Sequence, residues 1–522
     1  MPGERLTLPL RILLLAVAYV ILAKAGLFVA TVGKTVTLVW PPTGLSLAIL
    51  LLGSRREWPG VALGAFVANV STEGVGAATA AAIAVGNTLE AYVGATLIRR
   101  RDFHASLDRT RDVLRLVLWG AVVAPTLSAT IGTLAIGAAG IVPMGMALLP
   151  AFRIWWMGDG MSALVITPAL LAWIAPAELY EPRDRRECAA LVLTLGATSL
   201  FAVSHPAATT QYLVFPPIIW AALRFGPRGA TAATLVVTVV TVWSTVAGHG
   251  AFAVSTLADN LMSLHAFMAS VVLTGLVLGA TAAERARAIR AREHFISVAS
   301  HELRSPLAPI RLQVQRLLRN MAPNKEPMPR ERVVEALEVI DRQVERLTRL
   351  LEDVLDVTRL RLGRLQLSPK EMDLGALVDE IADAQREPLA LSGCTLKIER
   401  KGLLAGRWDR ERLSQVVTNL LSNAVKHGGA GVVELSLEGR PPNVRLIVRD
   451  HGPGVPEADR ERIFARFERG VPEAAAATHG VGLGLYIARE IVTAHGGRIS
   501  VFEPPGGGAA FEIVLPTAVP GG

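Results

Sequence analysis

The spacing of hydrophobic positions changes twice along the chain. From about Arg11 to Ala283 the sequence is a succession of long apolar runs. From Ile289 to Leu362 apolar residues repeat mostly every three or four positions, interrupted by the Asn- and Pro-rich segment 320–329, which predicts two amphipathic helices joined by a turn. From Asp373 to Leu515 helical spacing alternates with the two-residue spacing of strands. The pattern predicts a polytopic α-helical membrane domain, a helical hairpin and an α/β sandwich.

The apolar runs form about ten segments of near-spanning length. With ten spans, the Arg-rich amino terminus and five Arg-rich loops all fall on one side, which the positive-inside rule places in the cytoplasm together with the second half of the chain. The run Tyr212–Leu223 is short, so a re-entrant segment with fewer crossings is the alternative. We interpret the first run as a membrane span and not as a signal peptide that is removed, because further apolar runs follow it closely. The segments are Leu13–Thr31, Thr37–Leu52, Val61–Val75, Thr79–Leu97, Leu114–Ala139, Ala147–Trp173, Ala189–Val203, Tyr212–Leu223, Ala230–Val246 and Leu261–Ala280.

Among the polar residues that interrupt these runs, six stand out. Polar groups are costly in hydrocarbon unless they are paired or hydrated, so they mark either a functional site or hydrogen bonds between helices. The sequence leaves both readings open, for example for Asn87 and Glu90, which are three residues apart. The six are Asn69, Asn87, Glu90, Arg153, Asp159 and His265.

Composition narrows the classes of function. The net charge is +8, but Lys and Arg are scattered and form no basic stripe interleaved with aromatic residues, which argues against a nucleic-acid partner. The two cysteines, Cys188 and Cys394, lie far apart, so neither a disulfide framework nor a CxxC metal site is available. A hydrophobic content of 51% with only 5% aromatic residues fits an Ala-, Leu- and Val-rich helical bundle joined to a soluble part.

The segment Ser300–Leu307 contains a nucleophile beside a base. Proteins often use a histidine imidazole as a nucleophile or base near pH 7, so His301 can attack a phosphorus atom through one ring nitrogen if Glu302 accepts the proton from the other. Ser305 lies one helical turn further on the same face, where its hydroxyl can hold a water molecule. Pro306 leaves the Glu302 carbonyl without its helical partner and is expected to bend the helix.

The predicted hairpin is expected to pair with a second copy of itself. Its apolar stripe cannot be buried by one hairpin, whereas two hairpins can form a four-helix bundle, which predicts a homodimer. A plain coiled-coil spacer would explain the stripe but not the residues around His301.

The segment Ala282–Glu293 contains strong helix formers without Gly or Pro. A continuous helix from the membrane to His301 is therefore predicted, and this helix could rotate or slide.

Two segments of the third part have the chemistry of a nucleotide site. Asn419, Asn423 and Lys426 share one face of a predicted helix. There the Asn423 amide oxygen suits Mg²⁺, and Lys426 suits a phosphate. At the end of a strand, Asp450 can accept a hydrogen bond from an adenine amino group, and Gly452 and Gly454 let the base approach the backbone.

Two later segments complete this prediction. Phe464 and Phe467 can anchor a mobile lid, and Arg469 is a candidate phosphate contact. The loop Gly480–Leu485 precedes a helix, so its amides can hold phosphates at the helix amino terminus. Within this loop the candidate ATP-binding residues are Gly480, Gly482, Leu483, Gly484 and Leu485.

These four segments, in this order after the His301 hairpin, resemble the N, G1, F and G2 boxes of the sensor histidine kinases. The resemblance covers about Phe295 to Leu515 and implies a fold shared with gyrase and mismatch-repair ATPases, with ATP and Mg²⁺ as cofactors. It implies that Asn423 holds Mg²⁺, that Asp450 reads adenine and that the glycine-rich loop closes a lid. The chain departs from the family pattern at three positions. They are Ser305, where Thr or Asn is usual, His427, where Tyr is frequent, and Glu468, where an aromatic residue is common.

The membrane part resembles the first class of bacterial membrane-associated sensor domains. That family implies a sensory module of many helices and names no ligand. The residues that carry the resemblance are Trp40–Gly44, Arg153–Asp159, Thr167–Pro168 and Arg224–Gly229.

Together these features predict a homodimeric, multi-pass protein-histidine kinase of the cell (inner) membrane with its kinase part in the cytoplasm. It would phosphorylate His301 from ATP and pass the phosphoryl group to an aspartate of a separate response regulator. It would also act as a phosphatase toward that regulator, and an unknown signal ligand would control it. The alternatives are a transporter-like protein with a regulatory ATP-binding tail and a pseudokinase scaffold. The predicted domains are a membrane sensor domain (1–283), a helical linker (284–294), a dimerisation and phosphotransfer domain (295–366) and a catalytic ATP-binding domain (373–517).

Overall fold

The computed structural model divides the chain into two compact units, Met1–Arg290 and Ala291–Gly522. Each unit has its own hydrophobic core. The structure describes residues 7–28, 39–100, 102–145, 147–175, 185–205, 207, 209–252, 257–320, 329–361, 367–429, 431–465 and 482–518.

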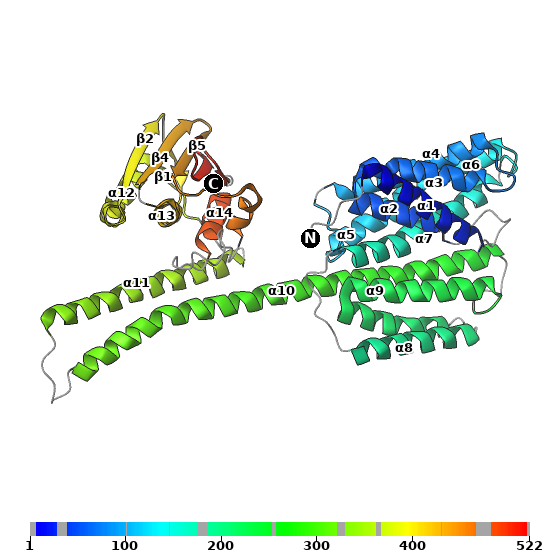
Figure 1. Ribbon diagram of the computed structural model, residues 1–522, viewed down its shortest axis with the longest axis horizontal. Coiled ribbons are helices and arrows are strands. Elements are labelled where there is room, and N and C mark those ends of the chain that lie inside the picture. Colours follow the sequence, from blue (N-terminus) through cyan, green and yellow to red (C-terminus); the bar gives the residue numbers. More distant parts are fainter. Residues whose placement is uncertain are drawn as a thin grey trace. The chain divides into compact units, whose positions relative to one another are not determined.

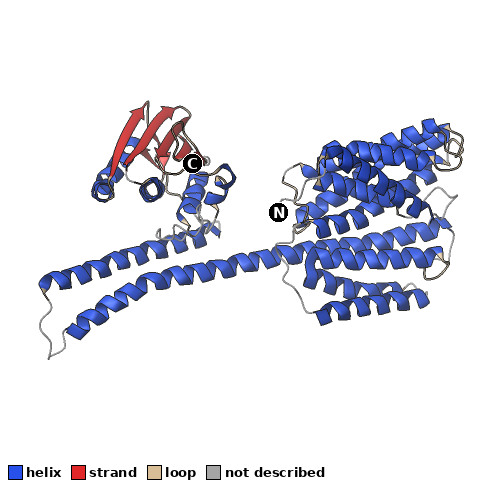
Figure 2. Cartoon of the chain, viewed as in Figure 1, coloured by secondary structure: helices blue, strands red, loops and turns tan. Residues whose placement is uncertain are grey.

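The first unit is helical throughout its described regular elements (Figures 1 and 2). In an apolar surrounding each backbone N–H and C=O group needs a partner within its own segment, so long runs of Ala, Leu and Val fold as helices. The helices are α1 (Leu8–Phe28), α2 (Pro41–Leu52), α3 (Trp58–Val70), α4 (Ala77–Arg99), α5 (Thr110–Arg115), α6 (Ala124–Ala138), α7 (Leu148–Ile174), α8 (Arg185–Ser204), α9 (Phe215–Val246) and α10 (Leu257–Asn320). A π-helical stretch, Leu116–Val123, joins α5 to α6.

Helix α9 reverses direction at Gly226. This residue has φ of 60° and ψ of −147°, a conformation that glycine adopts without a Cβ clash. A methyl group placed on Gly275 of α10 would lie 2.8 Å from the Thr234 side chain and 3.4 Å from that of Ile218. Thr234 and Ile218 are equally far from Gly226 along the chain, so the two legs of α9 run back beside each other. They correspond to the two separate apolar runs predicted in this region.

Seven helices in the described residues are long and apolar enough to cross a membrane, as judged by length and composition. Helices α2 and α3 are shorter, with 12 and 13 residues. When the two legs of α9 are counted separately, each predicted apolar segment overlaps a helix. The first unit is therefore suited to a multi-pass arrangement, and the ten-span scheme stays a prediction.

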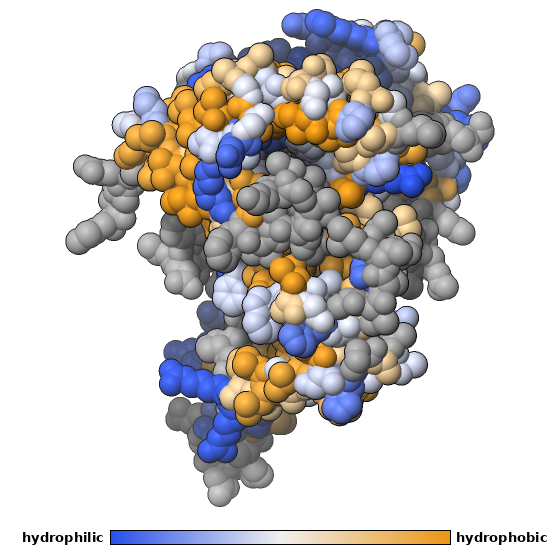
Figure 3. Space-filling view, turned by 90° about the vertical axis from the view of Figure 1, so that its right-hand side faces the viewer, coloured by the Kyte–Doolittle hydropathy of each residue, from blue (hydrophilic) through white to orange (hydrophobic). Residues whose placement is uncertain are grey.

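Large apolar side chains cover much of the outer surface of the first unit. Ile21, Val192, Leu193, Leu200 and Trp243 are between 63% and 73% exposed. Apolar residues also gather in patches on the face turned toward the viewer in Figure 3. Exposed apolar surface of this extent fits a lipid environment better than water.

The ten-span scheme predicts opposite locations for the two ends of the helices. A reporter fused after Arg100 or Arg185 is expected to report the cytoplasm, and one fused after His205 or His249 the opposite side of the membrane. Paired reporters active on only one side of the membrane would measure this. A cytoplasmic signal after His249 would contradict the scheme.

Helix α10 continues without interruption over 64 residues, so the last apolar run and His301 lie on one helix, as the sequence predicted. It continues through Pro306 and Pro309. The second helix of the hairpin is α11 (Arg330–Arg361). Many apolar side chains of the hairpin remain exposed in the single chain, among them Leu307, Leu312, Leu318, Leu337 and Leu355.

The rest of the second unit is built on a five-stranded mixed sheet of order β2-β4-β5-β7-β6. Strands β2 and β4 pair in parallel, and the other neighbours pair antiparallel. Side chains alternate between buried and partly exposed along β5 and β7, so one face of the sheet belongs to the core. The strands are β2 (Cys394–Lys401), β4 (Gly431–Arg440), β5 (Asn443–Arg449), β6 (Arg498–Phe502) and β7 (Ala510–Pro516).

Helices α12 (Leu374–Leu391), α13 (Arg410–Gly428) and α14 (Gly484–Ala494) lie on the same side of this sheet (Figure 1). Their buried side chains share one core with the buried faces of the strands, which confirms the predicted α/β sandwich. The sequence missed a small antiparallel pair, β1 (Lys370–Asp373) with β3 (Ala405–Trp408). Each has only four residues, too few for a period to be recognised.

Candidate active site

His301 presents an open imidazole on α10. Its side chain is 84% exposed, whereas that of Glu302 is 10% exposed. His301 Nδ1 lies 4.0 Å from Glu302 Oε1, and Arg346 of α11 lies 4.0 Å from Glu302 Oε2. Because Nδ1 is the ring nitrogen nearest the carboxylate, Nε2 is the nitrogen left open to attack an electrophile. The geometry suits Glu302 as the base predicted for it.

Ser305 is half-buried one turn after His301 on the same helix. Pro309 adds to the effect predicted for Pro306. Pro306 and Pro309 lie inside α10 and cannot donate to the carbonyl groups four residues earlier, those of Glu302 and Ser305. The turn that carries the reactive side chains therefore has two backbone acceptors without their usual helical donors.

Asp450 follows β5 and lies deep in the second unit, with 3% of its surface exposed. Its Oδ1 accepts hydrogen bonds from the backbone N–H groups of Gly452, at 2.9 Å, and Ala509, at 3.2 Å. These bonds fix the carboxylate through one oxygen and leave Oδ2 for a further donor. A methyl group on Gly428, at the end of α13, would lie 2.8 Å from Asp450 Cβ, so the end of α13 contacts this residue directly.

The predicted N box lies on α13 as expected. Asn419 contacts Gly484 at the amino terminus of α14, and a Cβ at position 484 would clash with its amide group. Asn419 Nδ2 is buried and makes no hydrogen bond within the described residues. Asn423 follows one turn later and is half-buried, and Lys426 is exposed. Three predicted segments therefore meet, because α13 contacts both Asp450 and the start of α14.

His427 is placed at the same junction. Its carbonyl oxygen contacts Gly452, where a Cβ would clash with it. Partial burial lowers the pKa of the His427 imidazole, and the neighbouring charge of Lys426 lowers it further. His427 is therefore mainly neutral at pH 7 and adds little positive charge to the site.

Four of the predicted residues of the glycine-rich loop are described. Gly482 has φ of 69°, Leu483 is buried, and Gly484 and Leu485 begin α14. The N-cap residue Leu483 makes no side-chain capping bond. Among the described residues, the first N–H groups of α14 are therefore suited to bind an anion. Gly454 has φ of 75° in the turn after Asp450. Phe467, Arg469 and Gly480 lie outside the described residues.

One polar contact of the second unit was not predicted. Asp356 of α11 is 6% exposed and accepts hydrogen bonds through Oδ2 from Arg412, at 2.7 Å, and from Gln415, at 2.9 Å. This contact ties the hairpin to α13, the helix that carries Asn419 and Asn423. The sequence feature that could have indicated this contact is the acidic residue directly after Leu355 of the apolar stripe.

Three of the six polar residues predicted within apolar runs come together in the first unit. Asn87 and Glu90 of α4 are 5% and 2% exposed, and Asp159 of α7 is 1% exposed. Glu90 interacts with Asp159, the carboxyl group beside it. The other three lie elsewhere: Asn69 donates to the Ala65 carbonyl of its own helix, Arg153 is exposed, and His265 Nδ1 lies 2.7 Å from the Leu261 carbonyl oxygen.

A polar clamp, formed by Asp108, Thr110, Glu284 and Arg287, holds α10 just beyond its apolar run. The N–H and hydroxyl groups of Thr110 donate to the two oxygens of Glu284 at 2.9 and 3.1 Å. Arg287 pairs with Asp108 at 2.8 Å. The clamp therefore fastens the start of α5 to the helix that continues to His301.

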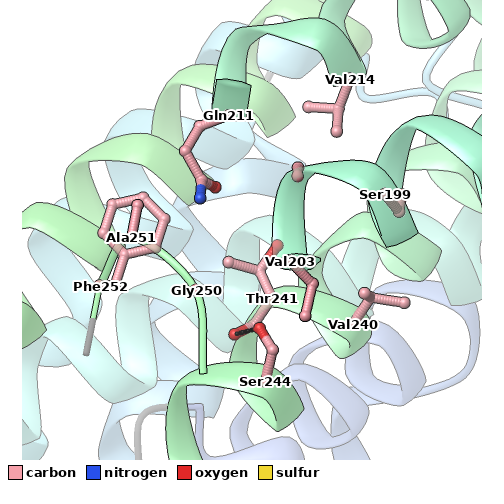
Figure 4. A pocket seen from close by; sticks show the side chains of 11 residues that line it. Ser199, Val203, Gln211, Val214, Val240, Thr241, Ser244, Gly250, Ala251 and Phe252 are labelled. Atoms are coloured by element: carbon pink, nitrogen blue, oxygen red, sulfur yellow. Dashed lines mark hydrogen bonds between the residues drawn. The ribbon is translucent and has the colours of Figure 1, made fainter. Parts of the chain in front are cut away.

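A small pocket lies between α8, α9 and the segment around Gly250 (Figure 4). Gln211, Thr241 and Ser244 provide polar side chains, and Val214 and Val240 provide apolar ones. No titratable side chain is among the described residues that line it.

Known proteins with related sequences include two mycobacterial sensor kinases. The chain is 34% identical over 252 residues to signal transduction histidine-protein kinase/phosphatase MprB of Mycolicibacterium paratuberculosis, covering 46% of this chain and 45% of that protein. It is 37% identical over 237 residues to probable sensor histidine kinase TcrY of Mycobacterium tuberculosis, covering 42% and 45%. The chain thus spans about half the length of the curated relatives it matches. Among solved structures, Acinetobacter baumannii histidine kinase AdeS is 24% identical with a TM-score of 0.33, covering 42% of this chain and 98% of that one.

Three sequence families match successive parts of the chain. Residues 291–363 match the His Kinase A (phospho-acceptor) domain, and residues 408–519 match the Histidine kinase-, DNA gyrase B-, and HSP90-like ATPase. Residues 11–286, more than half of the 522, match MASE1. The chain therefore belongs to the MASE1 family, and its second half carries the phospho-acceptor and ATPase domains of sensor histidine kinases.

Proposed function

We propose that this protein is a sensor histidine kinase that phosphorylates His301 from ATP. The observation that carries the proposal is the pairing of an exposed His301 imidazole with the largely buried Glu302 carboxylate, which faces Nδ1. The matched phospho-acceptor and ATPase families support it and do not favour the transporter-like alternative. Incubating the full-length protein in nanodiscs with ATP labelled at the γ position tests it. Acid-labile label on the protein is the expected result.

The reaction balances with the groups present. Nε2 of His301 attacks the γ-phosphorus, the bond from this phosphorus to the bridging oxygen breaks, and ADP leaves with the electron pair. Glu302 takes the proton from Nδ1, so the phosphorylated ring ends neutral. An aspartate of a separate response regulator then attacks the phosphorus, the P–N bond breaks with its electron pair returning to Nε2, and the proton on Glu302 returns to Nδ1.

The nucleotide would bind where α13, Asp450 and the start of α14 meet. Asp450 Oδ2 would accept from the adenine amino group, and the open N–H groups of α14 would hold phosphate oxygens. The polar face of α13 fits a phosphate-bound cation, because Asn423 offers a half-buried amide oxygen there. Mg²⁺ held at Asn423 would offset the charge of the phosphates.

The exposed apolar stripe of the hairpin supports a homodimer. Leu312 and Leu318 of α10 are each 64% exposed in the single chain, and Leu337 and Leu355 of α11 are more than half exposed. Water is a poor environment for such a stripe, and a second hairpin would bury it in a four-helix bundle. The same dimer would offer the exposed His301 to the regulator.

Ser305→Ala is expected to leave autophosphorylation near the wild-type rate but to slow dephosphorylation of the regulator on the order of 10-fold or more. The hydroxyl can position a water molecule for attack on the regulator's aspartyl phosphate, whereas the kinase step needs no such water. The decay of a receiver domain phosphorylated by this kinase, followed with ADP present, measures the effect. Ser305→Thr keeps the hydroxyl and serves as the control. Equal decay with wild type and Ser305→Ala would refute the phosphatase role.

A further inference from the structure

A group of hydrogen-bond acceptors without donors lies inside the first unit. Both oxygens of Glu90 and the Oδ1 of Asn87 are buried and make no hydrogen bond within the described residues. Asn87 Nδ2 donates to the Tyr19 hydroxyl oxygen at 2.8 Å, and this bond sets the orientation of the amide. Because Asn87 and Glu90 are three residues apart on α4, their side chains lie on the same face of the helix.

The hydrogen-bond donors near Glu90 already bond other acceptors. Trp155 Nε1 donates to the Ser128 oxygen at 3.1 Å, so the Ser128 hydrogen points to Asp159 Oδ2, 2.6 Å away. The Thr43 hydroxyl donates to Asp159 Oδ1 at 2.9 Å. Asp159 is thus held as an acceptor on both oxygens. The Trp155 indole hydrogen and the Ser128 and Thr43 hydroxyl hydrogens are thus directed to acceptors other than Glu90. Glu90 and Asp159 can share a hydrogen only if one of the two carboxyl groups carries a proton.

In the described helices around this group, no basic side chain compensates its charge. Lys24 of α1 donates to the Ala68 and Ser71 carbonyls, and Arg99 of α4 to the Leu51 and Gly53 carbonyls. Arg11 pairs with Glu57, and Arg153 is exposed. The titratable groups that face one another are Tyr19, Glu90 and Asp159. Two carboxylates buried in this way need a positive charge between them.

We propose that Glu90, Asp159 and Asn87 form a binding site for one small cation, and that its occupancy is an input to α10. All its ligands are oxygen atoms, which suits a proton or a hard metal cation such as Na⁺, Mg²⁺ or Ca²⁺. A proton and a metal ion would act in the same way here, because either would neutralise the Glu90 and Asp159 carboxylates. The input role rests on the kinase function proposed above, whereas the binding itself does not.

A continuous path of contacts leads from this site to α10. Ser128, which bonds Asp159, lies on α6, and α6 continues through the π-helical stretch into α5. The first residue of α5, Thr110, holds Glu284 of α10 in the polar clamp. π-helical turns are rare and are frequently found at functional sites. A cation that changes the Asp159 to Ser128 bond therefore acts on the helix that grips α10.

Binding is tested on the full-length protein in nanodiscs without nucleotide. Uptake of Na⁺, Mg²⁺ and Ca²⁺ would be measured one at a time, and infrared spectroscopy over a pH series would detect protonated carboxyl groups. Glu90→Gln and Asp159→Asn keep size and shape but remove the charge. Glu73→Gln, an exposed position between α3 and α4, is the matched control.

We expect one cation per chain, lost in Glu90→Gln and Asp159→Asn and kept in Glu73→Gln. Saturable metal uptake would identify a metal site, and a titrating carboxyl signal that disappears in Glu90→Gln, without metal uptake, would identify a proton site. Wild-type protein with neither response would overturn the proposal, and this measurement does not depend on the folding of any variant.

The input role is tested separately, by the rate of His301 phosphorylation. His301 phosphorylation by the wild type is expected to change severalfold over the concentration range in which the cation binds, and to be insensitive in Glu90→Gln. Cation binding with an unchanged rate would refute the input role. Complete absence of phosphorylation under all conditions would instead count against the kinase function, because binding is measured without ATP.

Discussion

His301→Gln is expected to abolish phosphorylation of the protein. Glutamine lacks a ring nitrogen that can carry a phosphoryl group, so no acid-labile label should remain after incubation with γ-labelled ATP. Because the side chain is 84% exposed, the free energy of unfolding should change by less than about 0.5 kcal/mol. ATP binding should stay intact, since His301 lies on α10 and the nucleotide residues lie on α13, after β5 and on α14.

Arg304→Gln is a matched control for this variant, because Arg304 is exposed in the same turn of α10. It should retain labelling, while His301→Gln should not. Gel filtration and a fluorescent ATP analogue would show that both variants are folded and bind nucleotide. Histidine labelling that persists in His301→Gln would mean that another residue accepts the phosphoryl group.

Asp450→Asn is expected to weaken ATP binding by a factor of ~10 to ~100 while leaving the fold intact. Asn keeps the Oδ1 acceptor for the Gly452 and Ala509 amides. It replaces Oδ2 by an NH₂ group, which meets the adenine amino group donor to donor. A lost hydrogen bond to a charged acceptor costs about 1.5–3 kcal/mol, which gives that range. Isothermal titration with a non-hydrolysable ATP analogue measures it.

Asp383→Asn provides the corresponding control. Asp383 lies on α12, where its carboxylate pairs with Arg386 and is 71% exposed. The same substitution there should leave ATP affinity unchanged. If Asp450→Asn binds the analogue as tightly as the wild type and the control, adenine is not read by Asp450.

Patterns with a clear period could be predicted from the sequence. The alternation of helices and strands in the third part, the hairpin and the continuous helix into the kinase part follow from spacing and from the absence of Gly and Pro in Ala282–Glu293. Asp450 and Asn419 could be chosen because Asp-x-Gly-x-Gly and Asn-x-x-x-Asn combine the right chemistry in the right order. The short pair β1 and β3 has too few residues to show a period, and it was missed.

Contacts between distant segments could not be read in the same way. The pairing of Asp356 with Arg412 and Gln415 joins residues that share no local pattern. Within the membrane part, Glu90 and Asp159 were recognised as costly, but nothing in the sequence indicates that they face each other. Ser128 gave no signal, and Thr43 was noted only as part of the segment Trp40–Gly44, since hydroxyl residues often bond their own helix in apolar runs.

The close packing of α10 against the two legs of α9 has a consequence for natural sequence variation. Gly275, Gly279 and Ala283 are spaced by four residues on α10, and a Cβ on Gly279 would lie 3.2 Å from the backbone of Gly226. At such positions the space available decides which residues are tolerated. Homologous proteins should therefore keep Gly, Ala or Ser at 275 and 279, whatever signal each one detects. The partly exposed positions Val277 and Leu278 need only remain apolar, so drift along this helix should follow the geometry of packing rather than the chemistry of the ligand.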